Sequence, residues 1–274
     1  MTLSAVVLDW AGTTVDFGSV APARTIERVF AEVGIMVDNR EVRRDMGLPK
    51  KEHIGRILYT PRVRDFWRAR FGHQPAVADL DALYDRFIPL QLACLSEYSD
   101  LIPGVLESVA DLRARHLKIG TTTGYTRAML NLLLDKSANA GYRPDCSLSP
   151  EDVGVGRPAP IMINEIAQRW AIREFTSIVK VGDTPADIQE GLNAGVWSVG
   201  VAGTGNGIGL PYDEFQALPV DDQRARLEDA RRELNQAGAH YVIDTLTNLA
   251  AVLDQIETRL AIADIPFRRS APLR

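Results

Sequence analysis

The chain has 274 residues, of which 46% are hydrophobic and 24% are charged, the mix of a folded globular protein rather than of a disordered chain. Its 31 basic and 36 acidic residues give a formal net charge of −5, and without a long basic run this balance argues against general nucleic-acid binding. A chain of this length can bury enough apolar surface to fold without disulfides. Its two cysteines indicate single thiols in a reducing compartment.

The start of the chain does not have the pattern of a secretion signal, because its apolar run ends at Asp9 without a basic leader. The longest uncharged stretch, residues 191–212, is long enough to span a bilayer. It holds seven glycines and a proline, however, and is therefore typical of strand and loop. We expect a cytoplasmic protein that has neither a membrane nor a nucleic acid among its partners.

Short apolar runs alternate with amphipathic segments along most of the chain. The apolar runs predict buried strands at residues 3–8, 117–121, 177–181, 196–201 and 240–243. The amphipathic segments predict helices at about 105–115, 127–139, 159–170, 186–194, 222–236 and 246–261. This alternation predicts an α/β protein with a Rossmann-like, doubly wound parallel sheet.

Residues 20–98 interrupt this alternation. They show helical periodicity at 22–33, 50–58, 61–71 and 80–95, with no convincing strand. We therefore predict an α/β core domain formed by residues 1–19 and 99–274, with residues 20–98 inserted as a helical cap domain. The basic, proline-containing end of the chain, residues 267–274, is expected to be a frayed terminus.

Asp9, Thr123 and Asp183 each lie at the end of a predicted strand. In a sheet of this type the ligand sits outside the carboxyl ends of the strands, so these side chains mark a candidate site. Asp9 is followed by Gly12 and Thr13, whose backbone amides we expect to bind a phosphate while the aspartate attacks phosphorus. An aspartate before such a turn is also ordinary loop chemistry.

A further acid, Asp187, lies four residues after Asp183. A divalent ion would offset the repulsion of these two acids with Asp9 and with a phosphoryl group, and Mg²⁺ suits a site made only of oxygen ligands. We therefore expect a Mg²⁺ site at these residues. The alternative for Asp187 is that it caps the helix that follows.

Taken in order, these residues resemble the motifs of the haloacid dehalogenase-like hydrolase superfamily. Asp9 matches its nucleophile, Thr123 the hydroxyl of its second motif, Arg157 the basic residue of its third, and Asp183 with Asp187 its fourth. The helical insertion matches the position of that superfamily's cap. The resemblance therefore covers nearly the whole chain.

One position departs from the phosphatases of that superfamily. They carry a second aspartate two residues after the nucleophile, which protonates a leaving alkoxide, and here that position is Ala11. Without a proton donor an oxygen leaving group departs as a poor, unprotonated anion. Either the chain is a disabled enzyme or its leaving group is not oxygen.

The predicted cap supplies a second unusual feature. Pro49 suits the first turn of a helix, which places Lys50 where the helix dipole disfavours an ammonium and lowers the lysine pKa. Such a lysine can attack a carbonyl as a neutral amine. His53 shares a helix face with Lys50 and is our candidate for proton transfers. Lys51 competes with Lys50 for the nucleophilic role, and either lysine could instead be an ordinary surface residue.

Together these features resemble the phosphonoacetaldehyde hydrolase (phosphonatase) family. The resemblance rests on Asp-Trp-Ala-Gly-Thr-Thr-Val-Asp at residues 9–16, Met-Gly-Leu-Pro-Lys at 46–50, Thr-Thr-Gly-Tyr-Thr-Arg at 122–127 and Gly-Arg-Pro at 156–158. It implies hydrolysis of the P–C bond of a small phosphonate aldehyde, with a homodimer as the assembly. We expect Met46 and Gly124 to line the substrate site.

The resemblance also assigns chemical roles. It implies that Lys50 forms a Schiff base, that Asp9 takes the phosphoryl group, and that Mg²⁺ is held by Asp9, Asp183 and the carbonyl of Ala11. Thr123 and Arg157 would stabilise the phosphoryl charge. An imine lets the electrons of the P–C bond enter an enamine, so this step needs no acid at position 11.

Three other readings are open on the sequence. A phosphatase or phosphomutase of the same superfamily is disfavoured because Ala11 stands where such an enzyme needs an acid. A dehalogenase is disfavoured because carbon–halogen displacement needs no Mg²⁺, whereas Asp183 and Asp187 suggest a Mg²⁺ site. A catalytically inactive binding scaffold has no reason to keep Asp9, Lys50 and Asp183 together.

Overall fold

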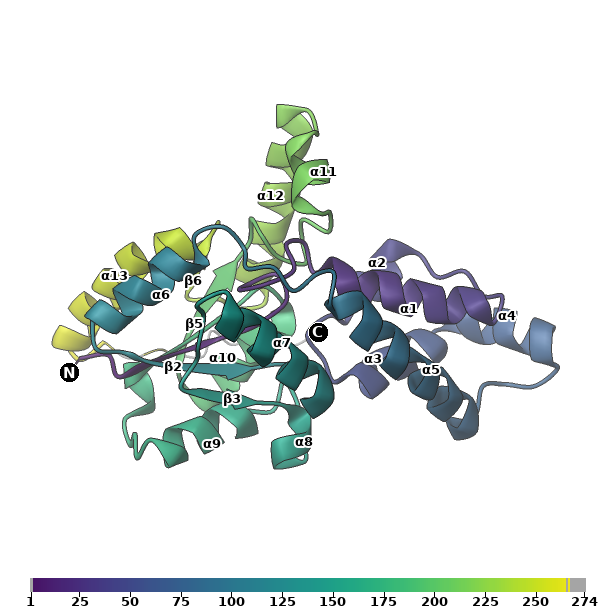
Figure 1. The fold of residues 1–274 in the computed structure, drawn as a ribbon, viewed down its shortest axis with the longest axis horizontal. Helices are drawn as coiled ribbons and strands as arrows, with labels where there is room; N and C mark the ends of the chain where they lie inside the picture. Colours follow the sequence, from purple (N-terminus) through teal and green to yellow (C-terminus); the bar gives the residue numbers. More distant parts are fainter. Residues whose placement is uncertain (1, 265, 267–274) are drawn as a thin grey trace.

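The computed structural model describes residues 2–264 and residue 266 (Figure 1), so the expected frayed terminus at 267–274 lies outside the described residues. Six strands form one sheet: β1 (Ala5–Leu8), β2 (Lys118–Thr122), β3 (Cys146–Leu148), β4 (Ile178–Gly182), β5 (Trp197–Val201) and β6 (Tyr241–Ile243). Their order is β3-β2-β1-β4-β5-β6, and every neighbouring pair is parallel. This is the doubly wound arrangement, in which the order reverses beside β1, and it confirms the predicted fold class.

Helices cover both faces of the sheet. The helices of the core are α6 (Val105–Ala114), α7 (Arg127–Asn139), α8 (Pro150–Val153), α9 (Ile161–Arg169), α10 (Pro185–Ala194), α12 (Val220–Gln236) and α13 (Leu249–Ala261), with short 3₁₀ turns at Phe175–Ser177 and Leu246–Asn248. A further short helix, α11 (Tyr212–Gln216), lies beside the part of α12 that projects away from the sheet (Figure 1). Alternate residues of β1 serve the two faces: Val6 and Leu8 join the cluster that includes α6, α7 and α13, whereas Ala5 and Val7 pack with α9. Burial on both sides explains why β1 is a continuous apolar run.

The helices between β1 and α6 lie to one side of the sheet (Figure 1). They are α1 (Val20–Glu32), α2 (Asn39–Arg44), α3 (Lys50–Leu58), α4 (Pro61–Phe71) and α5 (Val77–Leu95). We call residues 20–98 the cap and the other residues the core, and this domain division stays a prediction. Buried Phe30, Ile54 and Phe87 hold the cap together, and they belong to the same apolar cluster as Leu8 and Trp10 of the core.

The structure adds elements that the sequence patterns did not reveal. The strand β3 has only three residues, of which Cys146 and Ser147 are half-buried, so it has no apolar alternation to detect. The short helices α2, α8 and α11 were also missed, since each spans six residues or fewer. Among the described residues, no helix combines the length and hydropathy required to cross a membrane.

Two phenylalanines of the cap provide a matched test of its core. We expect Phe87→Ala to lower the free energy of unfolding by about 3–5 kcal/mol, because its side chain is fully buried and a cavity remains. Phe66 is 53% exposed, so Phe66→Ala should change the free energy of unfolding by less than about 0.5 kcal/mol. Urea unfolding of both variants measures the difference, and equal losses would contradict this packing.

Candidate active site

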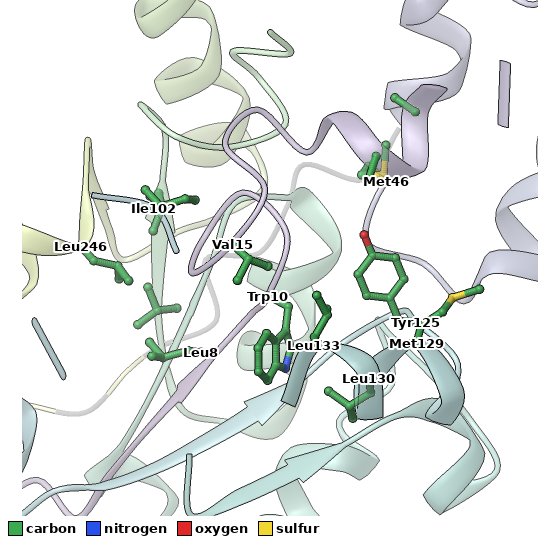
Figure 2. Close-up of a cluster of buried hydrophobic side chains, with 14 of the residues drawn as sticks. Leu8, Trp10, Val15, Met46, Ile102, Tyr125, Met129, Leu130, Leu133 and Leu246 are labelled. Carbon is green, nitrogen blue, oxygen red and sulfur yellow. The ribbon is translucent and has the colours of Figure 1, made fainter. Parts of the chain in front are cut away.

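Asp9 is fixed at the carboxyl edge of the sheet by the turn that follows β1. Its amide donates to the carbonyl of Val181 on β4 at 2.9 Å, and its carbonyl accepts from the Thr14 hydroxyl at 3.0 Å. The indole of Trp10 is buried beneath the turn and donates to Thr121 at 3.0 Å (Figure 2). These contacts leave the Asp9 carboxylate directed toward the site, with only 5% of the residue exposed.

Asp183 follows β4 and faces Asp9. Its Oδ2 accepts from the Ser19 hydroxyl at 3.0 Å and from the Asn206 amide at 2.7 Å, whereas its buried Oδ1 has no hydrogen-bond partner among the described residues. Carboxylate oxygens of Asp9, Asp183 and Asp187 lie within 4.8 Å of one another. Burial, with the charges of Asp9 and Asp187, raises the pKa of Asp183 well above its usual value.

Two buried cations lie next to these carboxylates. Arg157 places Nη1 2.7 Å from Asp9 Oδ1 and 2.8 Å from Asp187 Oδ1, and its Nε contacts Glu190 Oε2 at 3.0 Å. Lys180 Nζ lies 2.9 Å from Asp187 Oδ1. Burial opposes ionisation of Asp187, but the charges of Arg157 and Lys180 lower its pKa below the usual value.

The contacts of Asp187 bear on its two predicted roles. Its Oδ2 accepts from the Thr184 hydroxyl at 2.6 Å in a capping box at the start of α10, and its Oδ1 is held by Arg157 and Lys180. Both oxygens are therefore engaged within the protein. The structure favours a capping and charge-compensating role for Asp187 over direct metal ligation.

The donor set fits a divalent cation. Asp9, Asp183, Asp187 and Glu190 oppose Arg157 and Lys180, which leaves two negative charges when all four carboxylates are ionised. The free Oδ1 of Asp183 and the Asp9 carboxylate are hard oxygen donors of the kind that Mg²⁺ prefers. Ala11, whose carbonyl is the remaining member of the predicted set, also lines the cavity.

The lysine end of the site comes from the cap. Lys50 is the first residue of α3 and is only 4% exposed. Its Nζ lies 3.9 Å from Met46 Sδ and 5.1 Å from the centre of the Tyr125 ring. Burial lowers the pKa of Lys50 to about 8, partly offset by the charge of Asp9. By contrast, the Lys51 side chain is half exposed and pairs with Asp81 at 2.6 Å.

One small cavity joins the two ends. The core contributes Asp9, Ala11, Ser19, Thr123, Gly124, Tyr125, Arg157, Asp183 and Thr184 to its wall, and the cap contributes Pro22, Met46, Gly47 and Lys50. Its volume is about 20 Å³, enough for about one water molecule. Figure 2 shows the Tyr125 hydroxyl pointing toward Met46. The predicted residues Met46, Thr123 and Gly124 are thus brought together with Asp9 and Lys50.

Four predicted site residues do not line this cavity: Asp187, whose contacts are given above, Gly12, Thr13 and His53. The amide of Gly12 donates to the Val15 carbonyl at 2.7 Å and that of Thr13 to the Trp10 carbonyl at 3.2 Å, so both amides are used within their own turn. Gly12 is required there for another reason: its φ is +82°, and a Cβ would lie 2.1 Å from Asp183 Oδ2. The structure therefore gives Gly12 and Thr13 a part in shaping the turn and does not place them against a phosphate.

His53 is the fourth of these residues. It is fully buried, and its Nε2 lies 2.6 Å from the carbonyl of Val42. Because a carbonyl only accepts, Nε2 carries the proton and Nδ1 keeps a lone pair. Burial and the nearby charge of Lys50 lower the pKa of His53 to about 3, so the ring is neutral.

The comparisons with known proteins agree with this geometry. The model of the haloacid dehalogenase-like hydrolase family matches residues 3–195, which include Asp9, Lys50 and Asp183. Since this match covers most of the chain, the protein is a haloacid dehalogenase-like hydrolase.

More similar proteins narrow the family. The chain is 42% identical to phosphonoacetaldehyde hydrolase of Hahella chejuensis, covering 94% of this chain and 88% of that one, and 41% identical to the enzyme of Salmonella enteritidis, covering 96% and 98%. A solved phosphonoacetaldehyde hydrolase-like protein from Oleispira antarctica superimposes with a TM-score of 0.94 at 39% identity, covering 97% of this chain and 96% of that one. Within its superfamily the chain belongs to the phosphonoacetaldehyde hydrolase family.

Lys180 tests the charge balance of the site. We expect Lys180→Met to lower the free energy of unfolding by about 3–5 kcal/mol, because Asp187 and Glu190 lose a buried counter-charge. Lys136 is exposed, so Lys136→Met should change the free energy of unfolding by less than about 0.5 kcal/mol. Chemical denaturation at pH 7 compares the two, and a Lys180→Met variant as stable as the parent would refute an ionic network.

Proposed function

We propose that the protein hydrolyses the P–C bond of phosphonoacetaldehyde to acetaldehyde and phosphate, through a Schiff base on Lys50 and an aspartyl phosphate on Asp9. The observation that carries the proposal is that one small cavity has the Lys50 amine on its cap side and the Asp9 carboxylate on its core side. Ala11 also lines this cavity, at the position of the missing acid. The names of the relatives support the same substrate.

Lys50 begins the reaction. Its buried side chain has a pKa of about 8, so about a tenth of it is neutral at pH 7. The neutral amine attacks the aldehyde carbon, and loss of water leaves an imine whose protonated form carries a positive charge. Met46 and Tyr125 pack around Nζ and keep it out of water. Proton transfer by His53 at this stage stays a prediction.

Asp9 then attacks phosphorus. The P–C bond breaks, its electron pair enters the imine to give an enamine, and the phosphoryl group becomes bonded to a carboxylate oxygen of Asp9 as an acyl phosphate. Arg157 fixes the Asp9 carboxylate through Oδ1, and Thr123 lies on the same cavity wall to meet the phosphoryl oxygens. Bound Mg²⁺ would offset the negative charge shared between the phosphoryl group and the carboxylates.

Water completes the cycle. Hydrolysis of the Asp9 phosphate releases phosphate, and protonation of the enamine carbon followed by imine hydrolysis releases acetaldehyde and the free Lys50 amine. No step requires protonation of an oxygen leaving group by residue 11, which agrees with Ala11 at that position. The homodimer and the cytoplasmic location expected from the sequence remain part of this proposal.

The neighbouring residues Lys50 and Lys51 allow a direct test of which lysine forms the Schiff base. Borohydride reduction with phosphonoacetaldehyde should leave a two-carbon adduct on Lys50, detected by peptide mass spectrometry, and Lys50→Arg should abolish both the adduct and phosphate release. Lys51→Arg should retain both, since Lys51 is half exposed and paired with Asp81. A chelator should stop phosphate release by the parent protein. No adduct, together with phosphate release from sugar phosphates, would instead favour a phosphatase.

The buried state of Lys50 also predicts a pH dependence. Its pKa is lowered to about 8, so the neutral fraction grows as pH rises through 8 and then levels off. The rate of adduct trapping should therefore rise about tenfold between pH 7 and pH 9, whereas a solvated lysine would show a rise of about a hundredfold without a plateau. Rapid-quench trapping across this range measures the profile, and a rate still rising at pH 10 would contradict the buried amine.

A further inference from the structure

Arg43 connects the cap to the core through hydrogen bonds that take no part in the proposed reaction. It lies near the end of α2, and its guanidinium donates to five acceptors of the core, of which the carbonyls of Ser19 and Asn206 are the more distant at 3.4 Å. Nη1 donates to the carbonyl of Gly18 at 2.9 Å and to Asn206 Oδ1 at 3.1 Å, and Nη2 donates to the carbonyl of Gly209 at 3.0 Å. In return, Asn206 Nδ2 donates to the carbonyl of Arg43 at 3.1 Å. The contact is therefore reciprocal.

The core loop is shaped to accept this side chain. Gly209 has a φ of +70°, and a Cβ there would lie 3.0 Å from Arg43 Nε, so the backbone approaches the guanidinium as closely as glycine allows. On its own helix, Arg43 Nε donates to Asn39 Oδ1 at 2.8 Å, which fixes the orientation of the planar group. The planar guanidinium of arginine offers several donors in fixed directions, which suits this set of oxygen acceptors. The ammonium group of a lysine cannot make the same set of hydrogen bonds.

The same loop holds Asp183. The backbone amide of Asn206 donates to Asp183 Oδ2 at 2.7 Å, and the Ser19 hydroxyl donates to the same oxygen at 3.0 Å. Arg43 thus contacts Asn206 directly and Gly18 next to Ser19. The Arg43 side chain therefore contacts both segments of the core that orient the Asp183 carboxylate.

Arg43 also affects where Lys50 lies relative to the core. It precedes Lys50 by seven residues, and the intervening turn packs on the core at Gly47, where a Cβ would lie 2.4 Å from the Thr184 hydroxyl. Docking of α2 by Arg43 therefore sets how closely the start of α3, with Lys50, approaches the carboxyl edge of the sheet.

We propose that Arg43 is a positioning residue that latches the cap closed over the core, bringing Lys50 to Asp9 and at the same time ordering Asp183. Its core acceptors are neutral carbonyl and amide oxygens rather than carboxylates, so water can replace them when the cap opens. A cavity of about 730 Å³ between α2 and α12 is lined by Arg43, Asn206 and Gly209, which gives water access to the latch. The kinetic part of this inference rests on the proposed function.

The side chain of Asn206 makes a double-mutant cycle possible. With phosphonoacetaldehyde as substrate, Arg43→Ala and Asn206→Ala should each lower kcat/KM, the first by about 100-fold, the scale expected when reacting groups are misplaced by about 1 Å. Because both changes break one contact, the double variant should be no worse than Arg43→Ala alone. Arg43→Lys keeps the charge and should recover less than a tenth of the loss. Additive losses would overturn the latch.

Arg44 provides the control on the same helix. Its side chain is exposed and contacts Asp45 at 3.2 Å, so Arg44→Ala should retain the kcat/KM of the parent protein. A loss with Arg44→Ala equal to that with Arg43→Ala would show a general effect of α2 and overturn the specific role of Arg43.

Small-angle X-ray scattering tests closure without turnover. With Mg²⁺ and inorganic phosphate present, the parent and Arg44→Ala proteins should share one radius of gyration, and Arg43→Ala and Arg43→Lys should give larger values while keeping the far-UV circular dichroism of the parent. An unchanged radius in both Arg43 variants would overturn the latch. If the parent protein releases no phosphate from phosphonoacetaldehyde, the proposed function fails, and the scattering still decides the role of Arg43.

Discussion

The structure depends on placing four carboxylates at one buried edge of a parallel sheet. Asp9 and Asp183 follow β1 and β4, which are neighbours in the sheet, and α10 adds Asp187 and Glu190. Such a group is costly to bury unless its charges are matched. Arg157 and Lys180 supply part of the match, and a divalent cation bound by the remaining carboxylate oxygens would supply the rest. Under the proposed function, the same atoms would serve both the charge balance of folding and the chemistry of the site.

The position of the cap follows from this edge. The cap is inserted directly after the turn that carries Asp9, so its first helix begins beside the cluster, and Ser19 just before α1 donates to Asp183. The cap then returns through α5, which packs against α7 of the core. Because the cap carries Lys50 and the core carries Asp9, the two groups that the proposed function requires meet only where the interface between cap and core is well formed. Burial of Lys50 at this interface is also what lowers its pKa.

Much of this could be predicted from local patterns. Apolar runs located five of the six strands, and polar residues after those runs located Asp9, Thr123 and Asp183. What could not be predicted depends on tertiary contacts. The residue pattern alone leaves Lys50 and Lys51 as competitors and only the spacing of the family motif selects Lys50, whereas in the structure burial separates the two. The amides of Gly12 and Thr13 were expected to face a phosphate, but hydrogen bonds within the turn use them first. Lys180 was missed although a lone charge inside the apolar run of β4 is a detectable signal, since a buried lysine requires nearby carboxylates.

The size of the cavity has a consequence for substrate binding. A space of about 20 Å³ holds about one water molecule, whereas phosphonoacetaldehyde has several non-hydrogen atoms. The substrate of the proposed function therefore does not fit this conformation, and only the fraction of molecules in a more open form would be competent to bind it. The apparent dissociation constant is the intrinsic one divided by that fraction. A contact that favours the shut form of the free protein would thus weaken the initial binding of substrate while it assembles the site for reaction, so access and assembly would have to be balanced.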